Sequence, residues 1–326
     1  MGIADALGRN ICYLRVSVTD RCNFRCTYCM PSAGVEWISH QEILSYEEIE
    51  RIIRASARLG VYKVRITGGE PLMRKDLLPF IRNVAAIPGI SDLAMTTNGS
   101  ALSENAVKLK EAGLTRVNVS LDTLKPALFK KLTGRDMLAK VLAGIDSSYH
   151  AGLTPIKINM VVMKHVNDDE LPDFARMTLD KPYQVRFIEH MPFQTAQGKN
   201  EKLVPFSGMK DILAAGGFPT LLPESHGDGP AQVFRIPGAK GSLGFVSPVS
   251  RHFCEECNRI RLTADGRIKP CLLSNQEYNI KELLRSGCTD QELEEYLIDA
   301  IWHKPNQHLL DDETTELRRG MSKIGG

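Results

Sequence analysis

Six of the eight cysteines gather in two groups near opposite ends of the 326-residue chain. The first group has the spacing C-x₃-C-x₂-C and the second has C-x₂-C-x₁₃-C; the cysteines are Cys22, Cys26 and Cys29, then Cys254, Cys257 and Cys271. Closely spaced cysteines bind metal more often than they form disulfides inside a cell. Cluster ligation ordinarily takes four cysteines. Three thiolates therefore predict a cubane iron–sulfur cluster with one iron open to another ligand.

Zinc is the alternative for each group. It is the weaker alternative for the first, because structural zinc sites are closed by four ligands and usually contain C-x₂-C pairs. It competes seriously at the second, where His252 could complete a Cys₃His set. Arg259 and Arg261 follow this group directly and favour an open cluster beside a polyanionic substrate. The remaining cysteines, Cys12 and Cys288, are expected to be small buried side chains.

Polar side chains recur at every second position of several predicted strands, so those of one strand share a face. They are Arg15 and Ser17, Arg65 and Thr67, Thr96, Asn118 and Ser120, and Lys157 and Asn159. A strand covered by helices, or lying inside a filled barrel, should be apolar on both faces. Solvated edge strands would explain one or two of these faces but not five. The pattern therefore predicts a sheet that lines a wet cavity for an anionic ligand.

The elements that position these residues alternate in the first two thirds of the chain, which is typical of βα units. Strands are predicted at 13–19, 63–67, 92–97, 116–121, 155–163 and 183–189, and helices at 46–59, 75–86, 103–112, 137–151 and 168–179. Six units favour an α/β fold with an incomplete (β/α)₆ TIM-like barrel over a flat doubly wound sheet. The last third is rich in glycine and proline between 216 and 248 and ends in a helix from 290 to about 303. It is interpreted as a smaller α+β domain that carries the second cluster, with a division into 1–200 and 201–326.

The composition limits the possible partners. Apolar residues make up 43% and charged residues 25%, and the formal net charge is +2, which argues against a general nucleic-acid binder. No apolar run is long enough for a membrane span, and the first residues lack the apolar core of a signal peptide. A cytoplasmic location is expected.

The first cysteine group resembles the defining motif of the radical S-adenosylmethionine superfamily. Residues 67–71, Thr-Gly-Gly-Glu-Pro, resemble its Gly-Gly-Glu-Pro motif, in which glycines permit close backbone approach. The resemblance implies that S-adenosylmethionine binds the open iron and yields a 5′-deoxyadenosyl radical, so that the cofactor carries the difficult chemistry. It also implies that Tyr28, Gly69, Glu70, Ser120 and Met191 contact this cofactor.

Together the two groups resemble the GTP 3′,8-cyclase family of molybdenum cofactor biosynthesis. The similarity continues through Thr-Thr-Asn-Gly at 96–99, Val-Asn-Val-Ser-Leu-Asp at 117–122, Arg-Phe-Ile-Glu at 186–189, Gly-Pro-Ala at 229–231, Cys-Asn-Arg-Ile-Arg at 257–261 and the terminal Ile-Gly-Gly. It implies hydrogen abstraction from C3′ of GTP, attack on C8 of guanine, and then reduction and protonation. The product would be (8S)-3′,8-cyclo-7,8-dihydroguanosine 5′-triphosphate.

The same resemblance assigns the remaining roles. Arg15, Arg65, Thr96 and Lys157 would contact GTP, and the second cluster would bind the guanine. Arg259, Ile260 and Arg261 would lie along the substrate, and a flexible Gly325-Gly326 tail would reach the site. Asn159, on the same strand face as Lys157, is added to the substrate-binding residues. Arg259 or Arg261 is the candidate for the late proton donor. The chain has no G-x₄-G-K-[ST] loop, so side-chain cations would have to hold a triphosphate.

The partners expected are GTP, S-adenosylmethionine, a low-potential electron donor and a downstream cyclic pyranopterin monophosphate synthase, with no nucleic acid and no membrane. The protein itself would be a monomer or homodimer. Two rivals stay open: a peptide-modifying radical enzyme, which would typically carry more C-terminal cysteines, and a non-catalytic zinc- or iron–sulfur-binding redox or binding protein.

Overall fold

The computed structural model describes residues 2–30, 34–191, 201–225, 229–308 and 319–325. The chain divides into two compact units. Unit 1 consists of Met1–Thr97, Val107–Thr115 and Cys254–Gly326, and unit 2 of Asn98–Ala106 and Arg116–Phe253. Each unit has its own run of sheet.

The sheet of unit 1 has the strand order β14-β13-β12-β3-β4-β5. In that order the strands are Tyr278–Asn279, Arg267–Lys269, Arg259–Leu262, Tyr13–Ser17, Lys63–Thr67 and Asp92–Thr97. From β12 to β5 neighbouring strands are parallel, and β13 and β14 add antiparallel strands beyond β12. A separate pair is formed by β1 (Ile3–Ala4) and β2 (Asn10–Ile11).

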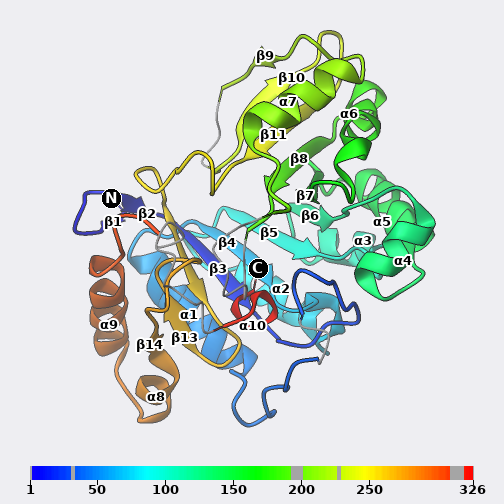
Figure 1. The fold of residues 1–326 in the computed structure, drawn as a ribbon. Helices are drawn as coiled ribbons and strands as arrows, with labels where there is room; N and C mark the ends of the chain where they lie inside the picture. The colour runs from blue at the N-terminus through cyan, green and yellow to red at the C-terminus, as the bar shows by residue number, and fades with distance from the viewer. Residues whose placement is uncertain (1, 31–33, 192–200, 226–228, 309–318, 326) are drawn as a thin grey trace. The chain divides into compact units, whose positions relative to one another are not determined.

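Helix α1 (Tyr46–Arg58) covers the apolar face of this sheet. The other helices of unit 1 are the 3-10 helix η1 (Pro71–Met73), α2 (Leu77–Ala85), α8 (Ile280–Arg285), α9 (Asp290–Trp302) and α10 (Met321–Ile324). A capping box of Ser45 and Glu48 begins α1, and its Ile49, Ile52 and Ile53 are fully buried where the helix packs against β3. Figure 1 shows α1 beside α9, which begins with a second capping box. The core of unit 1 therefore lies on one side of the sheet and leaves the other side to polar residues.

The sheet of unit 2 has the order β6-β7-β8-β11-β10-β9. The strands are Arg116–Ser120, Lys157–Val162, Gln184–Glu189, Ser242–Val246, Gln232–Arg235 and Leu222–Pro223, parallel from β6 to β11 and antiparallel beyond. The helices are α4 (Pro126–Thr133), α5 (Leu138–His150), η2 (Asp168–Glu170), α6 (Leu171–Asp180) and α7 (Phe206–Ala215). One further helix, α3 (Leu102–Glu111), contains residues of both units.

A buried carboxylate ties the later segments of unit 2 to the end of β8. Glu189 is fully buried and accepts hydrogen bonds from the backbone N–H groups of Phe206 (3.2 Å), Val249 (2.9 Å) and Ser250 (2.9 Å). Backbone donors of two separate segments, the start of α7 and the turn after β11, are thus satisfied by one anion, which holds both segments at the end of β8.

The six predicted strands are all present, with ends shifted by no more than two residues, and so are the predicted helices. The segment predicted as one helix from 168 is divided into η2 and α6. The last third is more regular than its glycine and proline content suggested: β11 pairs in parallel with β8, and β12 pairs in parallel with β3. Cys12 and Cys288 are buried, as expected. Among the helices described, none is long and apolar enough to cross a membrane.

Candidate active site

Three arginines stand in one row across the sheet of unit 1. The register pairs Arg261 of β12 with Arg15 of β3, and Arg15 with Arg65 of β4. Paired residues of adjacent strands project from the same face. Arg65 and Arg261 are buried and Arg15 is half-buried, so the row concentrates positive charge in a place with little solvent.

Burial and mutual repulsion lower the pKa values of two arginines of this row. Burial, followed by the like charges of Arg65 and Arg259, lowers the pKa of Arg15 to about 10, although the Tyr13 phenol opposes the shift. Burial, with Arg15 and Arg259 next, lowers the pKa of Arg261. Buried like charges disfavour the charged form and are stabilised by an anionic partner. Nη1 of Arg65 is buried and has no hydrogen-bond partner among the described residues. The row is therefore suited to bind a polyanion.

The polar face extends along the strands in both directions from the row. Two residues earlier, Arg259, Tyr13 and Lys63 are paired with one another. Two residues later, Ser17 pairs with Thr67, and Thr96 shares this face because it lies two positions after Ala94, the partner of Arg65. The Thr96 hydroxyl is buried and has no hydrogen-bond partner in the part of the chain that the structure describes. The side chain of Ile260 is fully buried and points to the opposite face, so its contact with a ligand of this face would involve its main chain.

The end of the chain lies on this same face. The carbonyl oxygen of Gly325 accepts hydrogen bonds from Arg15 Nη2 (3.4 Å) and Arg261 Nη1 (3.5 Å). Gly325 has a φ of +74°, and a Cβ there would lie 2.8 Å from Ser17 Cβ and 3.0 Å from Thr67 Cγ2. Glycine is required both for the left-handed backbone and for the close approach. Gly326 lies outside the described residues.

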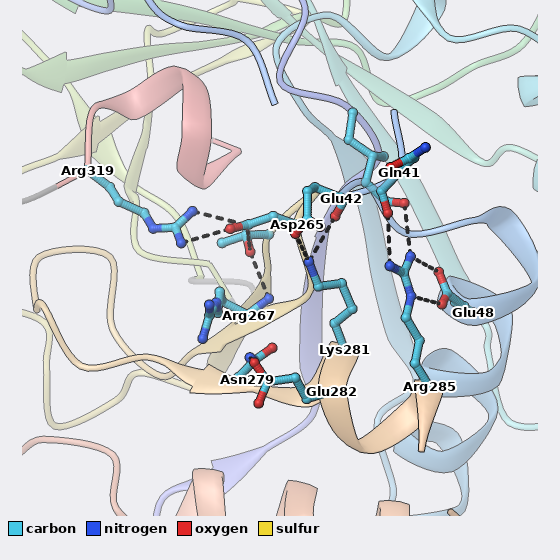
Figure 2. A network of polar contacts seen from close by, with 12 residues as sticks. Gln41, Glu42, Glu48, Asp265, Arg267, Asn279, Lys281, Glu282, Arg285 and Arg319 are labelled. Atoms are coloured by element: carbon cyan, nitrogen blue, oxygen red, sulfur yellow. Dashed lines mark hydrogen bonds and ion pairs between the residues drawn. The ribbon is translucent and has the colours of Figure 1, made fainter. Parts of the chain in front are cut away.

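Ion pairs hold the base of this terminal segment (Figure 2). Arg319 donates to both carboxylate oxygens of Asp265, at 3.0 and 2.8 Å, and its Nε lies 2.9 Å from Glu277 Oε2. Asp265 follows β12 in the hairpin that leads to β13 and also accepts from the Thr263 hydroxyl (2.6 Å). Burial would raise the pKa of Asp265, but the hydrogen bonds from Arg319 and Thr263 lower it. The segment before α10 is thus attached to the hairpin that carries Arg259 and Arg261.

The first cysteine group forms a loop directly after β3. The backbone N–H groups of Cys29 and Met30 both donate to the Cys26 carbonyl (2.9 Å each), which folds the C-x₂-C portion into a tight turn. The Phe24 N–H donates to Cys22 Sγ (3.4 Å). All three thiols are half-buried, as is Tyr28.

Residues 68 and 69 hold this loop through main-chain contact. A Cβ on Gly68 would lie 2.6 Å from the Thr19 carbonyl oxygen, and one on Gly69 would lie 2.3 Å from that of Arg21. The Gly69 N–H donates to Thr19 (2.6 Å), and the Glu70 N–H donates to Arg21 (2.8 Å). The glycine pair therefore permits a close approach to the backbone that immediately precedes Cys22. The Glu70 side chain is buried and accepts from the Leu72 N–H (3.1 Å) and the Thr97 hydroxyl (2.8 Å).

Buried cations surround the second cysteine group. Lys304 is 5% exposed, and its ammonium donates to the carbonyls of Arg259 (2.8 Å) and Pro270 (2.5 Å). Burial would raise the pKa of Cys257, but Arg259 and Lys304 lower it to about 7. Burial raises the pKa of Cys254, with contributions from Cys271 and Cys257, so the three thiols lie close enough to repel one another as thiolates.

Arg9, in the N-terminal segment, also binds the backbone around the second cysteine group. It is paired with Asp5 (2.5 Å) and donates to the carbonyls of Cys254 (2.9 Å), Lys304 (3.2 Å) and Pro305 (2.9 Å). The first and last parts of unit 1 are joined at the second cysteine group by charge-assisted hydrogen bonds, which are stronger than those between neutral groups.

The donor sets fit iron–sulfur clusters. Each group offers three half-buried thiols, one receives an amide hydrogen bond and the other lies beside cations, and both features stabilise thiolate sulfur. Within the described ranges, no three Cys, His, Asp or Glu side chains converge tightly enough to hold a single metal ion. An open cluster at the second group, rather than zinc held by its three thiols and His252, stays a prediction.

The candidate residues of unit 2 form aligned rows of their own. Ser120 pairs with Asn159 and Asn159 with Arg186, while Asn118 pairs with Lys157. The Asn159 side-chain oxygen is buried without a hydrogen-bond partner among the residues described. Met191 follows the end of β8 and is half-buried.

Four residues near these sites were not among the site residues predicted from the sequence: Tyr13, Arg186, Lys304 and Arg319. Of these, Arg186 appeared only as part of the motif at 186–189. Tyr13 and Arg186 could have been found by the period of two, because they share faces with Arg15 and with Asn159 through the register. Lys304 and Arg319 carry no such signal, because their partners are distant in sequence.

Comparison with known proteins first defines the class. The model of the radical SAM superfamily matches residues 16–178, and the model of the Molybdenum Cofactor Synthesis C family matches residues 183–310. The first covers the first cysteine group and the Gly-Gly-Glu-Pro segment, and the second covers the second cysteine group. The chain belongs to the radical SAM superfamily and is an enzyme of that class.

Full-length relatives then define the family. The chain is 48% identical over 325 residues to the GTP 3′,8-cyclase of Heliobacterium modesticaldum and 47% identical over 324 residues to that of Thermodesulfovibrio yellowstonii, covering 99% of both chains in each case. It is 45% identical to that of Geobacter sulfurreducens, with both chains covered completely. The chain belongs to the GTP 3′,8-cyclase family, as its motifs predicted.

Solved structures support the fold class. The Streptococcus suis SuiB structure with bound S-adenosylmethionine aligns with a TM-score of 0.60 at 16% identity, covering 90% of this chain and 64% of that chain. The anSMEcpe structure with bound AdoMet aligns with a TM-score of 0.55, covering 86% and 81%. The predicted α/β class is confirmed, with a mostly parallel sheet consistent with a partial TIM barrel and a C-terminal domain. The family models change between residues 178 and 183, and the division at residue 200 stays a prediction.

Proposed function

We propose that this chain cyclises GTP to (8S)-3′,8-cyclo-7,8-dihydroguanosine 5′-triphosphate, the first step of molybdenum cofactor biosynthesis. The family of the chain supports the activity. The observation that carries the proposal is the buried row of Arg261, Arg15 and Arg65, in the same compact unit as two groups of three cysteines. Such a row would bind a triphosphate without a phosphate-binding loop.

Cys22, Cys26 and Cys29 would hold a [4Fe-4S] cluster, and Tyr28, Gly69, Glu70, Ser120 and Met191 are proposed to contact S-adenosylmethionine. When bound, the cluster and S-adenosylmethionine supply a 5′-deoxyadenosyl radical that takes hydrogen from C3′ of the nucleotide. The chain's own contribution is to hold C3′ within contact distance and to exclude solvent. The close backbone contacts of Gly68 and Gly69 with residues 19–21 support a rigid position for the cysteine loop.

Cys254, Cys257 and Cys271 are proposed to hold a second [4Fe-4S] cluster that orients the guanine. The cations beside these thiols, Lys304 and Arg259, favour a thiolate set. Arg259 and Arg261 would lie along the nucleotide, with Ile260 contributing its main chain.

The triphosphate would be bound by Arg15, Arg65 and Arg261, and Thr96 offers a buried hydroxyl on the same face. Lys157 and Asn159 of unit 2 are proposed as further substrate contacts. Arg261 is the better candidate for the late proton donor, because burial and neighbouring arginines lower its pKa. The Gly325 carbonyl, which accepts from Arg15 and Arg261, would keep these side chains directed toward the site.

Further proposals concern the setting of the reaction. A low-potential electron donor would reduce the first cluster, and the product would pass to a cyclic pyranopterin monophosphate synthase. The enzyme would work in the cytoplasm as a monomer or homodimer.

The test is anaerobic incubation of the reconstituted protein with GTP, S-adenosylmethionine and dithionite. We expect 5′-deoxyadenosine and a cyclised product with the mass of GTP in equal amounts, and no product from ATP. Triple replacement of Cys254, Cys257 and Cys271 by alanine should remove about half of the iron and abolish cyclisation. Colourless, zinc-loaded protein that stays inert after reconstitution would instead support the non-catalytic alternative. Equal turnover of ATP would contradict the substrate.

A further inference from the structure

Tyr13 has a position among the arginines that the proposed function does not use. It begins β3, pairs in register with Arg259 of β12 and Lys63 of β4, and is 4% exposed. Arg15 lies two residues later on the same strand face, and Arg65 is the diagonal neighbour on β4. A single phenol is therefore enclosed by cationic side chains from three adjacent strands.

Direct contacts show how the phenol is used. Arg65 Nε donates a hydrogen bond to the Tyr13 hydroxyl oxygen. The Arg65 guanidinium carbon lies 5.6 Å from the centre of the Tyr13 ring, and Lys63 Nζ lies 5.1 Å from it. Lys63 has its own carboxylate partner, Asp92 of β5, at 3.4 Å. Arg65 Nη1, by contrast, is buried without a hydrogen-bond partner among the described residues. Tyr13 thus fixes one edge of the Arg65 guanidinium and leaves another edge for a ligand.

The charges around the phenol favour its ionised form. The groups that face it are Arg15 on β3, Lys63 and Arg65 on β4, and Arg259 and Arg261 on β12. Burial would raise the pKa of Tyr13, but Arg65, Arg15, the Arg65 hydrogen bond and Arg259 lower it to about 7.

We propose that Tyr13 is a positioning residue that orients Arg65 for the triphosphate and serves as the counter-anion of the arginine row while the nucleotide is absent. This inference rests on the proposed function. A bound triphosphate brings several negative charges to the same guanidinium groups, so it replaces the phenolate as their partner and the phenol regains a proton. Nucleotide binding is therefore linked to the uptake of one proton by Tyr13.

The direction of the pH dependence follows from this linkage. At a pH well below 7 the phenol is already protonated, and GTP binding is independent of its titration. Above pH 7 binding must protonate a phenolate, so GTP affinity falls as the pH rises, by up to about tenfold per pH unit. Guanosine, which carries no phosphate, leaves the phenolate in place and should bind without this dependence.

The experiment is isothermal titration of the reconstituted protein with GTP and with guanosine, in the absence of S-adenosylmethionine, at pH 6.5 to 8.5 and in buffers of different ionisation enthalpy. For the wild type we expect about tenfold weaker GTP binding at pH 8.5 than at pH 7, with proton uptake. Tyr13→Phe keeps the ring and removes the titrating group. It should bind GTP more weakly at pH 6.5 because Arg65 loses its anchor, and it should lack the extra pH dependence and proton uptake.

Tyr46→Phe is the matched control. Tyr46 also has an arginine over its ring, with the Arg74 guanidinium carbon 4.0 Å from the ring centre, and its hydroxyl donates to Lys75. Burial raises the pKa of Tyr46, so this residue does not titrate in the range used. Its replacement should leave unchanged both the GTP affinity and the slope, which is the change of GTP affinity per pH unit.

An equal slope and equal proton uptake in wild type and Tyr13→Phe would overturn the proposal, and so would a wild type whose GTP affinity is constant from pH 7 to 8.5. If Tyr13→Phe does not fold, the ultraviolet titration of tyrosinate in wild type and Arg65→Lys replaces it: one tyrosine titrating near pH 7 in the wild type and at higher pH in the variant supports the proposal, and its absence contradicts it. The binding and titration measurements need no turnover, so their outcome is independent of the cyclisation assay. Failure of the assay would reject the proposed function, whereas failure of the slope would reject the role of Tyr13.

Discussion

The two cysteine groups lie in one compact unit but are held by different forces. The first loop is held by main-chain contact, with Gly68 and Gly69 pressed against the carbonyls of residues 19–21. The second is held by charged side chains, with Lys304 and Arg9 donating to carbonyls around Cys254, Arg259 and Pro270. The first arrangement depends on shape and hardly on solution conditions. The second depends on charge, so pH, salt and neutral substitutions should act on it selectively.

The largest effect is expected from Gly69→Ala, which disrupts the main-chain contacts that hold the first cysteine loop. The new Cβ would lie 2.3 Å from the Arg21 carbonyl oxygen, which is main chain and cannot rotate away. Overpacking of this kind costs about 1–3 kcal/mol, and a shift of the cysteine loop by about 1 Å can cost about a hundredfold in rate. We expect 5′-deoxyadenosine formation to fall by about a hundredfold or more, with loss of iron from the first group.

Gly208→Ala provides the control for this change. Gly208 lies in α7, its nearest contact for a new Cβ is 3.5 Å, and alanine favours helix. Both iron content and turnover should be retained. Full activity of Gly69→Ala would show that the loop tolerates displacement and would remove the contrast between the two groups.

A smaller and more selective effect is expected from Lys304→Met in the second arrangement. The substitution keeps the length of the side chain but leaves the Arg259 and Pro270 carbonyls without this donor and removes a cation from beside Cys257. Each buried acceptor left unpaired costs about 1–3 kcal/mol. The iron content should fall by about half, cyclisation should drop strongly, and cleavage of S-adenosylmethionine at the first group should continue.

Lys110→Met, an exposed lysine of α3, is the comparison for Lys304→Met, and it should change none of these quantities. If Lys304→Met retained all its iron and its electronic spectrum, the charge-based account of the second group would be wrong.

The ion pairs of Arg319 extend the second arrangement to the terminal segment. Arg319→Met removes the contacts to Asp265 and Glu277 and should free residues 319–325 from the β12–β13 hairpin. The loss of global stability should be about 1 kcal/mol or less, because the pair is partly solvated. We expect faster amide exchange across α10 and about fivefold slower cyclisation, with unchanged binding of S-adenosylmethionine.

The contribution of the Arg319–Asp265 ion pair to stability should depend on pH in a defined direction. Arg319 lowers the pKa of Asp265, so the contribution of the pair is complete above the ordinary aspartate pKa and is lost as the pH falls through the lowered value. Wild type should therefore lose more stability than Arg319→Met on acidification below about pH 4. Arg319→Lys should restore part of the difference. Identical acid profiles of wild type and Arg319→Met would show that the Arg319–Asp265 ion pair does not stabilise the protein.

The sequence predicted the parts of this molecule that local rules determine. Alternating strands such as 63–67 and the glycines that end helices were sufficient to place the parallel sheet, and the period of two placed Arg15 and Arg65 on one face. It did not predict β11 and β12 as partners of β8 and β3, because strand pairing between distant segments has no local signal. The same limit applies to Lys304 and Arg319. Their function as anchors depends on carbonyls and carboxylates that folding brings near them from other segments of the chain.

The smallest effect concerns Glu70, a proposed contact of S-adenosylmethionine whose carboxylate is already engaged by the Leu72 N–H and the Thr97 hydroxyl. Thr97→Val removes one of these bonds and costs about 1 kcal/mol of stability. If Glu70 also faces the cofactor, its loosened carboxylate should weaken S-adenosylmethionine binding by up to about fivefold and leave GTP binding unchanged. Thr115→Val removes a similar hydroxyl bond in the same unit, from Thr115 to the Leu93 carbonyl (2.6 Å), and should cost the same stability with no change in either affinity. Equal S-adenosylmethionine affinity in both variants would show that Glu70 only supports the backbone near the first cysteine loop and does not contact the cofactor. That loop would then be held entirely by close packing of its main chain.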